Sequence, residues 1–316
     1  MIGAIGIGVI GAGAFGTALA CAAAAGGRPI TLWGRAATPA SVALRLPGVA
    51  LPAGVALTDD LDRLAGVEAL LLVLPAQATE GFLAAHGAAL PPVPLVLCAK
   101  GVDARRFRLQ SEIAAEALPG RPLAVLTGPG FAGEISRGLP TALTLACADP
   151  DLGPALQARL STPRMRLYLT DDLIGAQLGG ALKNVVAIAC GMVEGAGLGH
   201  SARAALMTRG FAEMTRLAAA LGARPETLTG LSGLGDLSLT CNSRGSRNFA
   251  LGAALGAGAP APSGTVEGVA TARAACELAR RQGVELPIAA AVAAVLDGLP
   301  LAEAMEALLA RPLREE

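Results

Sequence analysis

The sequence predicts an α/β fold in its first part, with a doubly wound and mostly parallel sheet, followed by an all-α domain. Three observations lead to this prediction. Short continuous apolar runs alternate with helical stretches up to residue 171, a glycine-rich turn follows the first run, and helical stretches dominate afterwards. A chain of 316 residues also suggests two domains, at about 150 residues each. We therefore expect domains at 1–171 and 172–316.

The expected strands are short and apolar throughout, which is typical of strands buried on both faces of a sheet. They lie at 7–10, 30–33, 69–74, 94–99, 123–128, 141–146 and 165–170. The helices expected among them lie at 14–25, 59–64, 76–89, 107–118 and 151–161. The second domain should contain helices at 173–195, 202–221, 224–228, 246–256, 265–282, 287–298 and 301–310, with a Gly/Pro loop at 255–264.

The composition excludes several classes of protein. Hydrophobic residues make up 53% of the chain and charged residues 16%, which is too apolar for a disordered protein. The formal net charge is zero, whereas proteins that bind nucleic acid usually carry a basic excess. The six cysteines form no CxxC pair and the two histidines no HExxH motif, so we expect no metal site. Unpaired apolar cysteines indicate a reducing compartment, and we expect a cytoplasmic protein.

The first 27 residues carry no charged side chain and are long enough to cross a membrane. They lack the basic start of a signal peptide, and they are rich in glycine, which disfavours a helix interior. A buried strand, a turn and a buried helix explain the same apolarity. We therefore expect no stable membrane insertion, and membrane tethering remains an alternative.

The stretch GAGAFG (11–16) matches the GxGxxG pattern of dinucleotide-binding turns. It follows an apolar strand and opens an apolar helix, as a Rossmann-type fold requires. Gly11 would permit the tight turn, Gly13 would let a pyrophosphate approach the backbone, and Gly16 would let the helix pack on the strand. The helix N-terminus would offer free N–H groups to the phosphates. The alternative is a glycine-rich turn without a ligand.

Two basic residues follow strands of the expected sheet. NAD-specific sites usually have Asp or Glu about 20 residues beyond the glycines, but the second strand here ends in LWGR, with Arg35 at that place. We therefore expect NADP and NAD as cofactors, with NADP favoured; a surface arginine is the alternative. Lys100 in CAKG ends another strand, where it can meet a phosphate or the nicotinamide, unless it is an ordinary loop lysine.

The stretch GGALKNVVAIACGM (179–192) places a lysine on an otherwise apolar helix. Every fourth residue forms one apolar stripe: Leu178, Leu182, Val186 and Cys190. Lys183 lies on the neighbouring stripe with the small residues Gly179, Ala187 and Gly191, which would allow a backbone or a ligand to come close. Lys183 could snorkel to water from a half-buried helix. The functional alternative is a proton donor held in a dry cleft.

A polar cluster lies in GLSGLGDLSLTCNSRGSRN (230–248). Ser246 suits a helix N-cap, and Arg247 offers a planar fork that matches a phosphate. Together with free backbone N–H groups they would make an anion site, whereas the alternative is a capped surface helix. Asp236, bracketed by glycines, could equally cap a turn.

These motifs together resemble a known family. GAGAFGTALA, AKG, GALKNVVAIACG, TRGFAEMTRL, GLSGLGDLSLTCNSRGSRN and VEG occur in this order, as in the bacterial-type NAD(P)-dependent glycerol-3-phosphate dehydrogenases. The resemblance covers Gly6 to Gly268 and, more loosely, the rest of the chain. It implies that dihydroxyacetone phosphate and sn-glycerol 3-phosphate are interconverted, which would feed phospholipid synthesis.

The resemblance also implies roles for single residues. Lys183 matches the family's catalytic lysine and Asp236 a carboxylate of the substrate site. The substrate-binding positions are Lys100, Gly128, Gly130, Lys183, Asp236, Ser246, Arg247 and Asn248. The cofactor-binding positions, with the three glycines of the turn, are Ala14, Phe15, Arg35, Lys100, Ala132, Arg247, Thr265 and Glu267.

The chain departs from the family pattern at some positions. The family usually reads close to SGPSFAKE where this chain has TGPGFAGE (127–134). Gly130 therefore lacks a side chain that could contact substrate, so only its backbone could serve. Gly133 replaces a lysine that is usual there, and Gln177 stands where Glu is common. These differences concern details of the pocket and leave the expected reaction unchanged.

The expected mechanism follows from the reaction. Reduction of a ketone needs a hydride on carbon and a proton on oxygen; the reduced cofactor would supply the first and Lys183 the second. Burial would ease the loss of its proton, because desolvation disfavours the ammonium, while Asp236 would orient the amine. The rival functions are a two-domain 3-hydroxyacid or keto-acid dehydrogenase and a non-catalytic dinucleotide sensor. A homodimer remains open.

Overall fold

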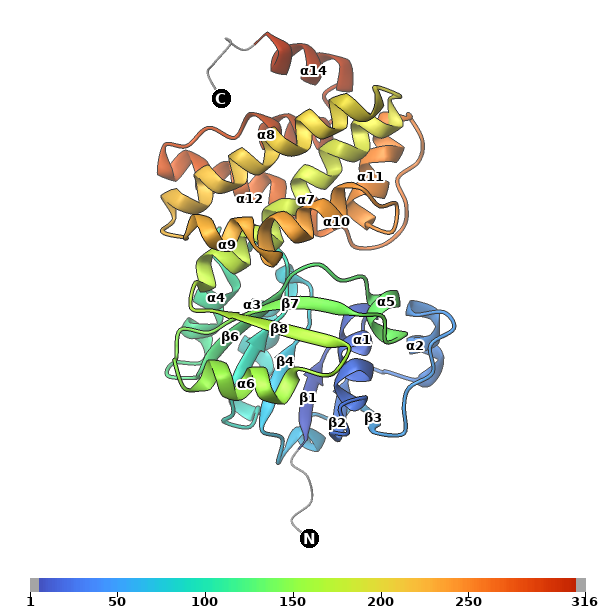
Figure 1. Ribbon diagram of the computed structural model, residues 1–316, viewed down its shortest axis with the longest axis vertical. Helices are drawn as coiled ribbons and strands as arrows, with labels where there is room; N and C mark the ends of the chain where they lie inside the picture. The colour runs from blue at the N-terminus through green and yellow to red at the C-terminus, as the bar shows by residue number, and fades with distance from the viewer. Residues whose placement is uncertain (1–5, 311–316) are drawn as a thin grey trace. The chain divides into compact units, whose positions relative to one another are not determined.

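The computed structural model describes residues 6–310, which form two compact units (Figure 1). The first unit extends to Lys100 and resumes over Arg108–Gln177; the second comprises Gly101–Phe107 and the residues from Leu178 onward. The boundary expected near residue 171 thus precedes the division of the structure by a few residues. The assignment of Gly101–Phe107 to the helical unit was not expected, and both outer ends of the two expected domains lie outside the described residues.

The first unit contains one eight-stranded sheet, in the order β3-β2-β1-β4-β5-β6-β7-β8. The strands are β1 Ile7–Ile10, β2 Ile30–Trp33, β3 Val55–Thr58, β4 Ala69–Leu72, β5 Leu95–Leu97, β6 Leu123–Thr127, β7 Thr141–Ala146 and β8 Met165–Thr170. Neighbouring strands run parallel, except that β6 and β7 are antiparallel. The prediction of a mostly parallel, doubly wound sheet is confirmed.

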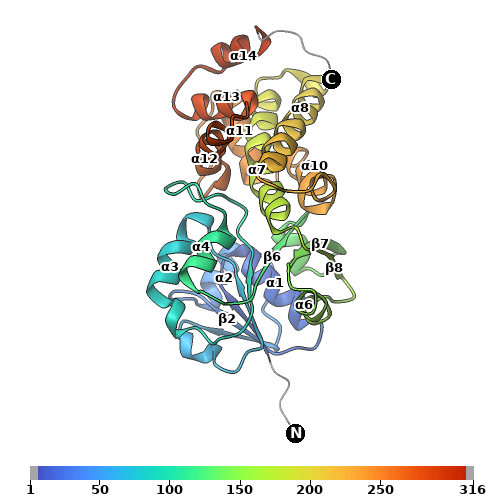
Figure 2. The same ribbon diagram turned by 90° about the vertical axis from the view of Figure 1, so that its left-hand side faces the viewer.

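Helices cover both faces of this sheet, which explains why its central strands are apolar throughout. Alternate residues enter two separate cores: Leu71 and Val96 belong to one, Leu72 and Leu97 to the other. Figure 2 shows α3 and α4 on one side of the sheet and α1 and α6 on the other. The helices of this unit are α1 Ala14–Ala24, α2 Pro39–Arg45, α3 Thr79–His86, α4 Gln110–Ala117, α5 Ala132–Ser136 and α6 Leu152–Leu160, with 3₁₀ turns η1 Leu61–Leu64, η2 Ala76–Ala78 and η3 Gly87–Ala89.

The second unit is helical, as expected from residue 173 onward. Its elements are α7 Leu173–Gly195, whose first residues belong to the first unit, α8 Gly199–Ala220, α9 Pro225–Thr229, the π-helical turn η4 Leu231–Gly235, α10 Asp236–Cys241, α11 Arg247–Gly256, α12 Glu267–Gln282, α13 Pro287–Leu296 and α14 Leu301–Leu309. Glu213 of α8 is buried, and its carboxylate accepts the backbone N–H groups of Ile288 and Ala289 at 2.7 and 3.2 Å. This carboxylate satisfies N–H groups in the first turn of α13 and therefore has a structural role.

Helices α7 and α11 touch backbone to backbone. A Cβ atom on Gly252 would collide with the carbonyl oxygen of Ile188, and one on Gly256 with that of Met192. The contact also involves a glycine of α7, because a Cβ on Gly191 would meet the backbone of α11. Since the contacts advance along both helices together, the two helices run parallel. Glycine is required at this contact because any side chain would force the helices apart.

We expect Gly252→Ala to destabilise the protein by roughly 1–3 kcal/mol, the usual cost of overpacking a well-packed contact. Gly81→Ala is the matched control, because a Cβ on this residue of α3 has no atom within 4 Å. Alanine there should leave stability unchanged or raise it by up to about 1 kcal/mol. Urea unfolding followed by circular dichroism measures both; equal midpoints for Gly252→Ala and wild type would contradict the proposed contact.

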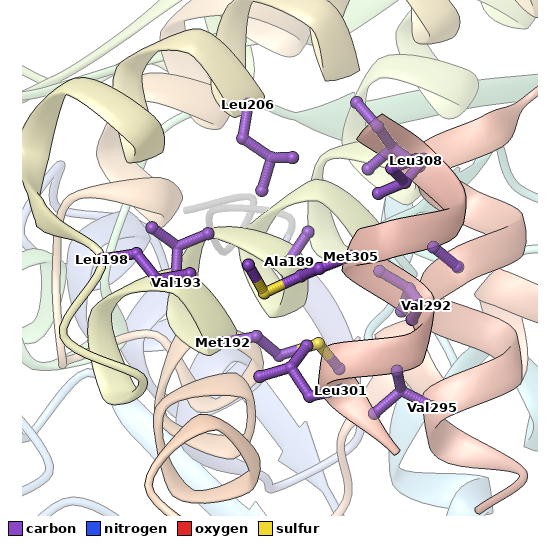
Figure 3. Close-up of a pocket in the computed structure, with 13 residues that line it drawn as sticks. Ala189, Met192, Val193, Leu198, Leu206, Val292, Val295, Leu301, Met305 and Leu308 are labelled. Atoms are coloured by element: carbon purple, nitrogen blue, oxygen red, sulfur yellow. The ribbon is translucent and has the colours of Figure 1, made fainter. Parts of the chain in front are cut away.

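An apolar cavity lies in the second unit, among α7, α8, α13 and α14 (Figure 3). Its empty volume of about 390 Å³ includes space open to solvent, and Met192, Leu206, Val292 and Met305 are among its lining residues. All thirteen lining side chains are apolar. The cavity therefore offers no group that could bind a phosphate or transfer a proton.

Within residues 6–310, only α7 is long and apolar enough for a membrane span by length and composition. In its most apolar window, 89% of the residues are buried inside the protein. The apolar stretch at the start of the sequence, whose first five residues lie outside the described part, forms β1, the glycine turn and the largely buried helix α1 from Ile7 onward. The apolarity of these segments is accounted for by packing within the units.

Candidate active site

The amine of Lys183 is buried in the second unit. Lys183 is only 7% exposed, and its Nζ donates hydrogen bonds to Oδ1 of Asp236 at 2.9 Å and to Oγ1 of Thr240 at 2.7 Å. The hydroxyl of Thr240 in turn donates to the backbone carbonyl of Asp236 at 2.6 Å. The snorkelling alternative is therefore wrong. Thr240 was missed from the sequence, although it follows Asp236 by one helical turn.

Close backbone contacts hold Asp236 beside the lysine helix. A Cβ on Gly179 would lie 2.6 Å from the carbonyl oxygen of Ser232, and a Cβ on Gly233 would collide with the carbonyl oxygen of Leu228. These glycines let the π-helical turn η4 fold against α9 and α7 immediately before Asp236. π-Turns of this kind are frequent at functional sites. The stripe of small residues on α7 is thus covered by other backbones: Gly179 contacts the backbone of Ser232, and Gly191 contacts the backbone of α11.

A second polar network lies beside this cluster. The side-chain amide of Asn248 donates to Oδ1 of Asn184 at 2.8 Å, and its oxygen accepts the backbone N–H of Gly268 at 2.9 Å. Asn184 and Asn248 are 64 residues apart, the same offset as in the glycine contacts of α7 and α11. Asn184, the residue after Lys183, therefore holds the start of α11 through Asn248. Asn248 in turn holds the first turn of α12, which begins at Glu267.

The start of α11 combines a side-chain cap with an exposed arginine. Ser246 is the N-cap, and its hydroxyl accepts the backbone N–H of Phe249 at 3.2 Å, as the sequence predicts. Arg247, the first residue of the helix, is exposed, and no hydrogen bond or ion pair joins its guanidinium to the rest of residues 6–310. Thr265 is likewise exposed in the loop before α12. A free guanidinium at a helix N-terminus is suited to an anion.

The glycine turn of the first unit has the geometry of a phosphate cradle. Gly11 adopts a positive φ of 117°, and a Cβ on Gly16 would collide with the carbonyl oxygen of Gly11. Above Gly13, by contrast, a Cβ would have no atom within 4 Å. Helix α1 starts at Ala14 without a side-chain cap, so its first N–H groups remain available. Phe15 follows in the first turn, and these residues fit the pyrophosphate of a dinucleotide.

Lys100 lies at the carboxyl edge of the same sheet. Its Nζ donates to the carbonyl oxygen of Gly128 at 2.7 Å and lies 5.5 Å from the ring centre of Phe15. Lys100 follows β5 and Gly128 follows the adjacent strand β6, where Gly128 has a φ of +123°. The structure thus gathers three predicted positions at one point, and Ala132 begins α5, which packs on α1.

The departures from the family pattern have different physical settings. A Cβ on Gly130 would lie 2.8 Å from Cδ1 of Ile135. The side chain of Ile135 therefore occupies the space that a side chain at position 130 would need. A Cβ on Gly133 would meet nothing within 4 Å. The amide of Gln177 accepts from the backbone N–H of Ser111 and donates to its hydroxyl, both at 2.9 Å. Gln177 suits this pairing because an ionised glutamate has no proton to donate.

Only two of the 25 basic residues are lysines, and they are Lys100 and Lys183. All others are arginines, so the chain uses arginine for its surface cations. A lysine retained in this background indicates a task that arginine cannot do, such as releasing a proton. This count is a signal in the sequence that supports both positions independently of any motif.

Other reactive groups of the described residues are poorly suited to chemistry. No group of three or more His, Cys, Asp or Glu side chains within residues 6–310 could hold a metal ion. The six cysteines are free thiols. Burial raises the pKa of Cys98 to about 12, and a hydrogen bond with Cys190 together with burial raises the pKa of Cys241. Thiols with raised pKa values are weak nucleophiles at neutral pH.

Comparisons with known proteins agree along nearly the whole chain. Residues 6–153 match the N-terminal domain of NAD-dependent glycerol-3-phosphate dehydrogenase, and residues 172–306 match the C-terminal domain. Glycerol-3-phosphate dehydrogenase [NAD(P)+] of Cereibacter sphaeroides is 58% identical over 315 residues, covering 98% of this chain and all of the relative. The same enzyme of Paracoccus denitrificans is 56% identical over 314 residues, covering 98% and 99%.

Solved structures give the same result. The crystal structure of glycerol-3-phosphate dehydrogenase from Coxiella burnetii superposes with a TM-score of 0.92 and 35% identity, covering 98% of this chain and 99% of that one.

Proposed function

Because the chain belongs to the NAD-dependent glycerol-3-phosphate dehydrogenase family, we propose that it interconverts dihydroxyacetone phosphate and sn-glycerol 3-phosphate with NAD(P) as cofactor. The observation that carries the proposal is the buried amine of Lys183, held by Asp236 and Thr240. A non-catalytic dinucleotide sensor would need the glycine cradle but no buried proton donor.

Lys183 acts as the general acid in the direction of reduction. Its Nζ gives a proton to the carbonyl oxygen of the substrate as that oxygen becomes a hydroxyl, and the neutral amine takes this proton back in the direction of oxidation. When bound, the reduced nicotinamide supplies the hydride for the carbonyl carbon. Asp236 and Thr240 fix the direction of the amine, and proton transfer of this kind contributes typically ~10²–10⁴-fold to the rate.

The phosphate of the substrate is bound by charges away from the reacting carbon. Arg247 and the uncovered N–H groups of α11 form one part of this site, and Lys100 contributes a further cation. Ser246 and Asn248 hold the start of α11 in place. Binding the phosphate orients the carbonyl toward Lys183, so remote binding energy becomes catalytic.

Two sets of residues follow for this chain. The cofactor would be held by Gly11, Gly13, Ala14, Phe15, Gly16, Arg35, Lys100, Ala132, Arg247, Thr265 and Glu267. The substrate would be held by Lys100, Gly128, Gly130, Lys183, Asp236, Ser246, Arg247 and Asn248. At Gly130 only the backbone is available, since Ile135 occupies the space of a side chain.

The test is the absorbance of the reduced cofactor after addition of dihydroxyacetone phosphate, with NADH and NADPH in parallel. We expect oxidation of both cofactors. Keto acids and 3-keto acids serve as competing substrates, because a related two-domain dehydrogenase would prefer them. Turnover of these acids alone would reject the proposal, and absent turnover with every ketone would favour the sensor.

The Arg35→Glu variant tests the preference for NADP. We expect it to lose affinity for NADPH by about 10- to 100-fold while retaining NADH, because a carboxylate repels the 2′-phosphate and suits a free ribose hydroxyl. Titration of cofactor fluorescence measures both affinities. Unchanged NADPH affinity would refute the assignment.

The setting of the enzyme is part of the same proposal. Its product would feed glycerophospholipid synthesis from the cytoplasm, and the protein would act without nucleic acid or a stable membrane anchor. We further propose a homodimer, which light scattering of the purified protein tests directly.

A further inference from the structure

We propose that Arg45 is a second ligand of the 2′-phosphate of NADP and acts together with Arg35. This inference rests on the proposed dinucleotide-dependent reaction and deepens its cofactor preference. It is carried by contacts inside the first unit: Arg45 donates a hydrogen bond to Ala12 of the glycine turn, and Gly34, the residue before Arg35, packs against Ala12.

Ala12 marks the place of the adenosine ribose. It lies between Gly11 and Gly13, whose backbone receives the pyrophosphate in folds of this type. The ribose is received at the end of β2, and this end contacts the glycine turn directly. The N–H of Gly11 donates to the carbonyl of Trp33 at 2.8 Å. A Cβ on Gly34 would lie only 2.6 Å from the Cβ of Ala12. A ribose bound between these two segments must lie beside Ala12.

The backbone of Arg35 is held in a tight turn beside this point. The N–H of Ala37 donates to the carbonyl of Gly34 at 3.1 Å, which closes the turn around Arg35 and Ala36. Ala36 has a φ of +46°, a left-handed conformation that costs energy for a residue with a side chain. Such strain is frequent where a functional side chain must be held in one direction.

Arg45 reaches the same point from the last turn of α2. Its Nη1 donates a hydrogen bond of 2.8 Å to the carbonyl oxygen of Ala12. A guanidinium carries five N–H donors in a planar fork, so this contact leaves others available. The helix that carries Arg45 is itself fixed, since Thr38 and Ser41 form a capping box at its start. Arg45 is therefore a prepositioned cation.

Carboxylates also lie at this edge of the sheet. Asp59 and Asp60 follow β3, the neighbour of β2, and bring negative charge to this edge of the sheet. The carboxylate of Asp60 is occupied by the N–H of Asp62 at 2.9 Å. A single arginine would have to balance these carboxylates before attracting a dianion. The second guanidinium adds positive charge beside the ribose, and only NADP carries a 2′-phosphate that this charge attracts.

The test uses the protein and two fragments of the cofactor, 2′,5′-ADP and 5′-ADP, with binding measured by calorimetry. We expect Arg45→Met to weaken 2′,5′-ADP by about 10- to 100-fold and to change 5′-ADP by less than about twofold. The Arg35→Met variant should behave alike. Arg164→Met is the matched control, an exposed arginine before β8 at the opposite edge of the sheet, and should change neither ligand.

A purely structural role of Arg45 predicts a different pattern. If it only supported the glycine turn, Arg45→Met would weaken both fragments equally, and this result would overturn the inference, as would unchanged binding of 2′,5′-ADP. The measurement is independent of catalysis. Oxidation of NADH by dihydroxyacetone phosphate in the same variant reports separately on the proposed reaction, so failure of one proposal is distinguishable from failure of the other.

Discussion

Lys183→Ala should lower kcat for dihydroxyacetone phosphate by ~10²–10⁴-fold, which is the usual contribution of general acid catalysis. NADPH should still bind to this variant. The amine of Lys183 is the buried proton donor of the helical unit, and its partners, Asp236 and Thr240, have no comparable proton to give at neutral pH. The loss should appear in kcat at saturating substrate. Cofactor oxidation measures turnover, and cofactor fluorescence measures binding.

Two controls separate chemistry from folding. Lys183→Ala leaves the carboxylate of Asp236, which is 1% exposed, without its cation, and an unpaired buried charge destabilises a protein. Lys183→Arg restores the positive charge, but a guanidinium does not release its proton at neutral pH. We expect this variant to fold and remain nearly inactive. Near-normal turnover in either variant would remove the lysine from the mechanism.

Arg247→Ala should raise the KM for dihydroxyacetone phosphate by about 10- to 150-fold, which corresponds to the loss of ~1.5–3 kcal/mol from hydrogen bonds to a charged group. Its guanidinium is exposed at the N-terminus of α11 and makes no contact within the described residues that folding would need. The unfolding midpoint should therefore stay within experimental error of that of wild type.

Arg244→Ala is the matched control for this prediction. Arg244 lies three residues earlier in the same NSRGSRN segment, its side chain is 79% exposed, and its nearest partner, Glu194, is 4.0 Å away. A surface pair of this kind contributes little. If Arg247→Ala and Arg244→Ala shift KM equally, or if neither shifts it, the phosphate is bound elsewhere.

The sheet could be predicted because its strands are buried on both faces. Strands such as β4 and β5 are continuous apolar runs, a pattern that does not depend on contacts far away in the chain. The strand β3 was missed, since it lies at the edge, is half exposed and reads as a loop next to Pro52 and Gly54. The short helices α2 and α5 were missed for a related reason: seven and five residues give too little periodicity.

The site was predictable where local sequence carries the signal. The small residues beside Lys183 on α7 predicted that a backbone or a ligand would approach, and a backbone does so; Ser246 carries an N-cap signature. Thr240 was not predicted, because a hydroxyl in DLSLT reads as an ordinary helix residue until the fold brings it to the amine. The membership of Gly101–Phe107 in the helical unit is equally invisible, since tertiary packing decides it.

The direct contact of α7 with α11 has a consequence for what the enzyme can recognise. With glycine backbones in contact, no side chain is present there that evolution or an engineer could enlarge or trim by small steps. The separation between the backbone positions of Lys183 and Arg247 is thereby fixed. Ketones whose phosphate sits one carbon nearer or farther should be poor substrates, and a redesign for longer chains would have to rebuild the helix pair.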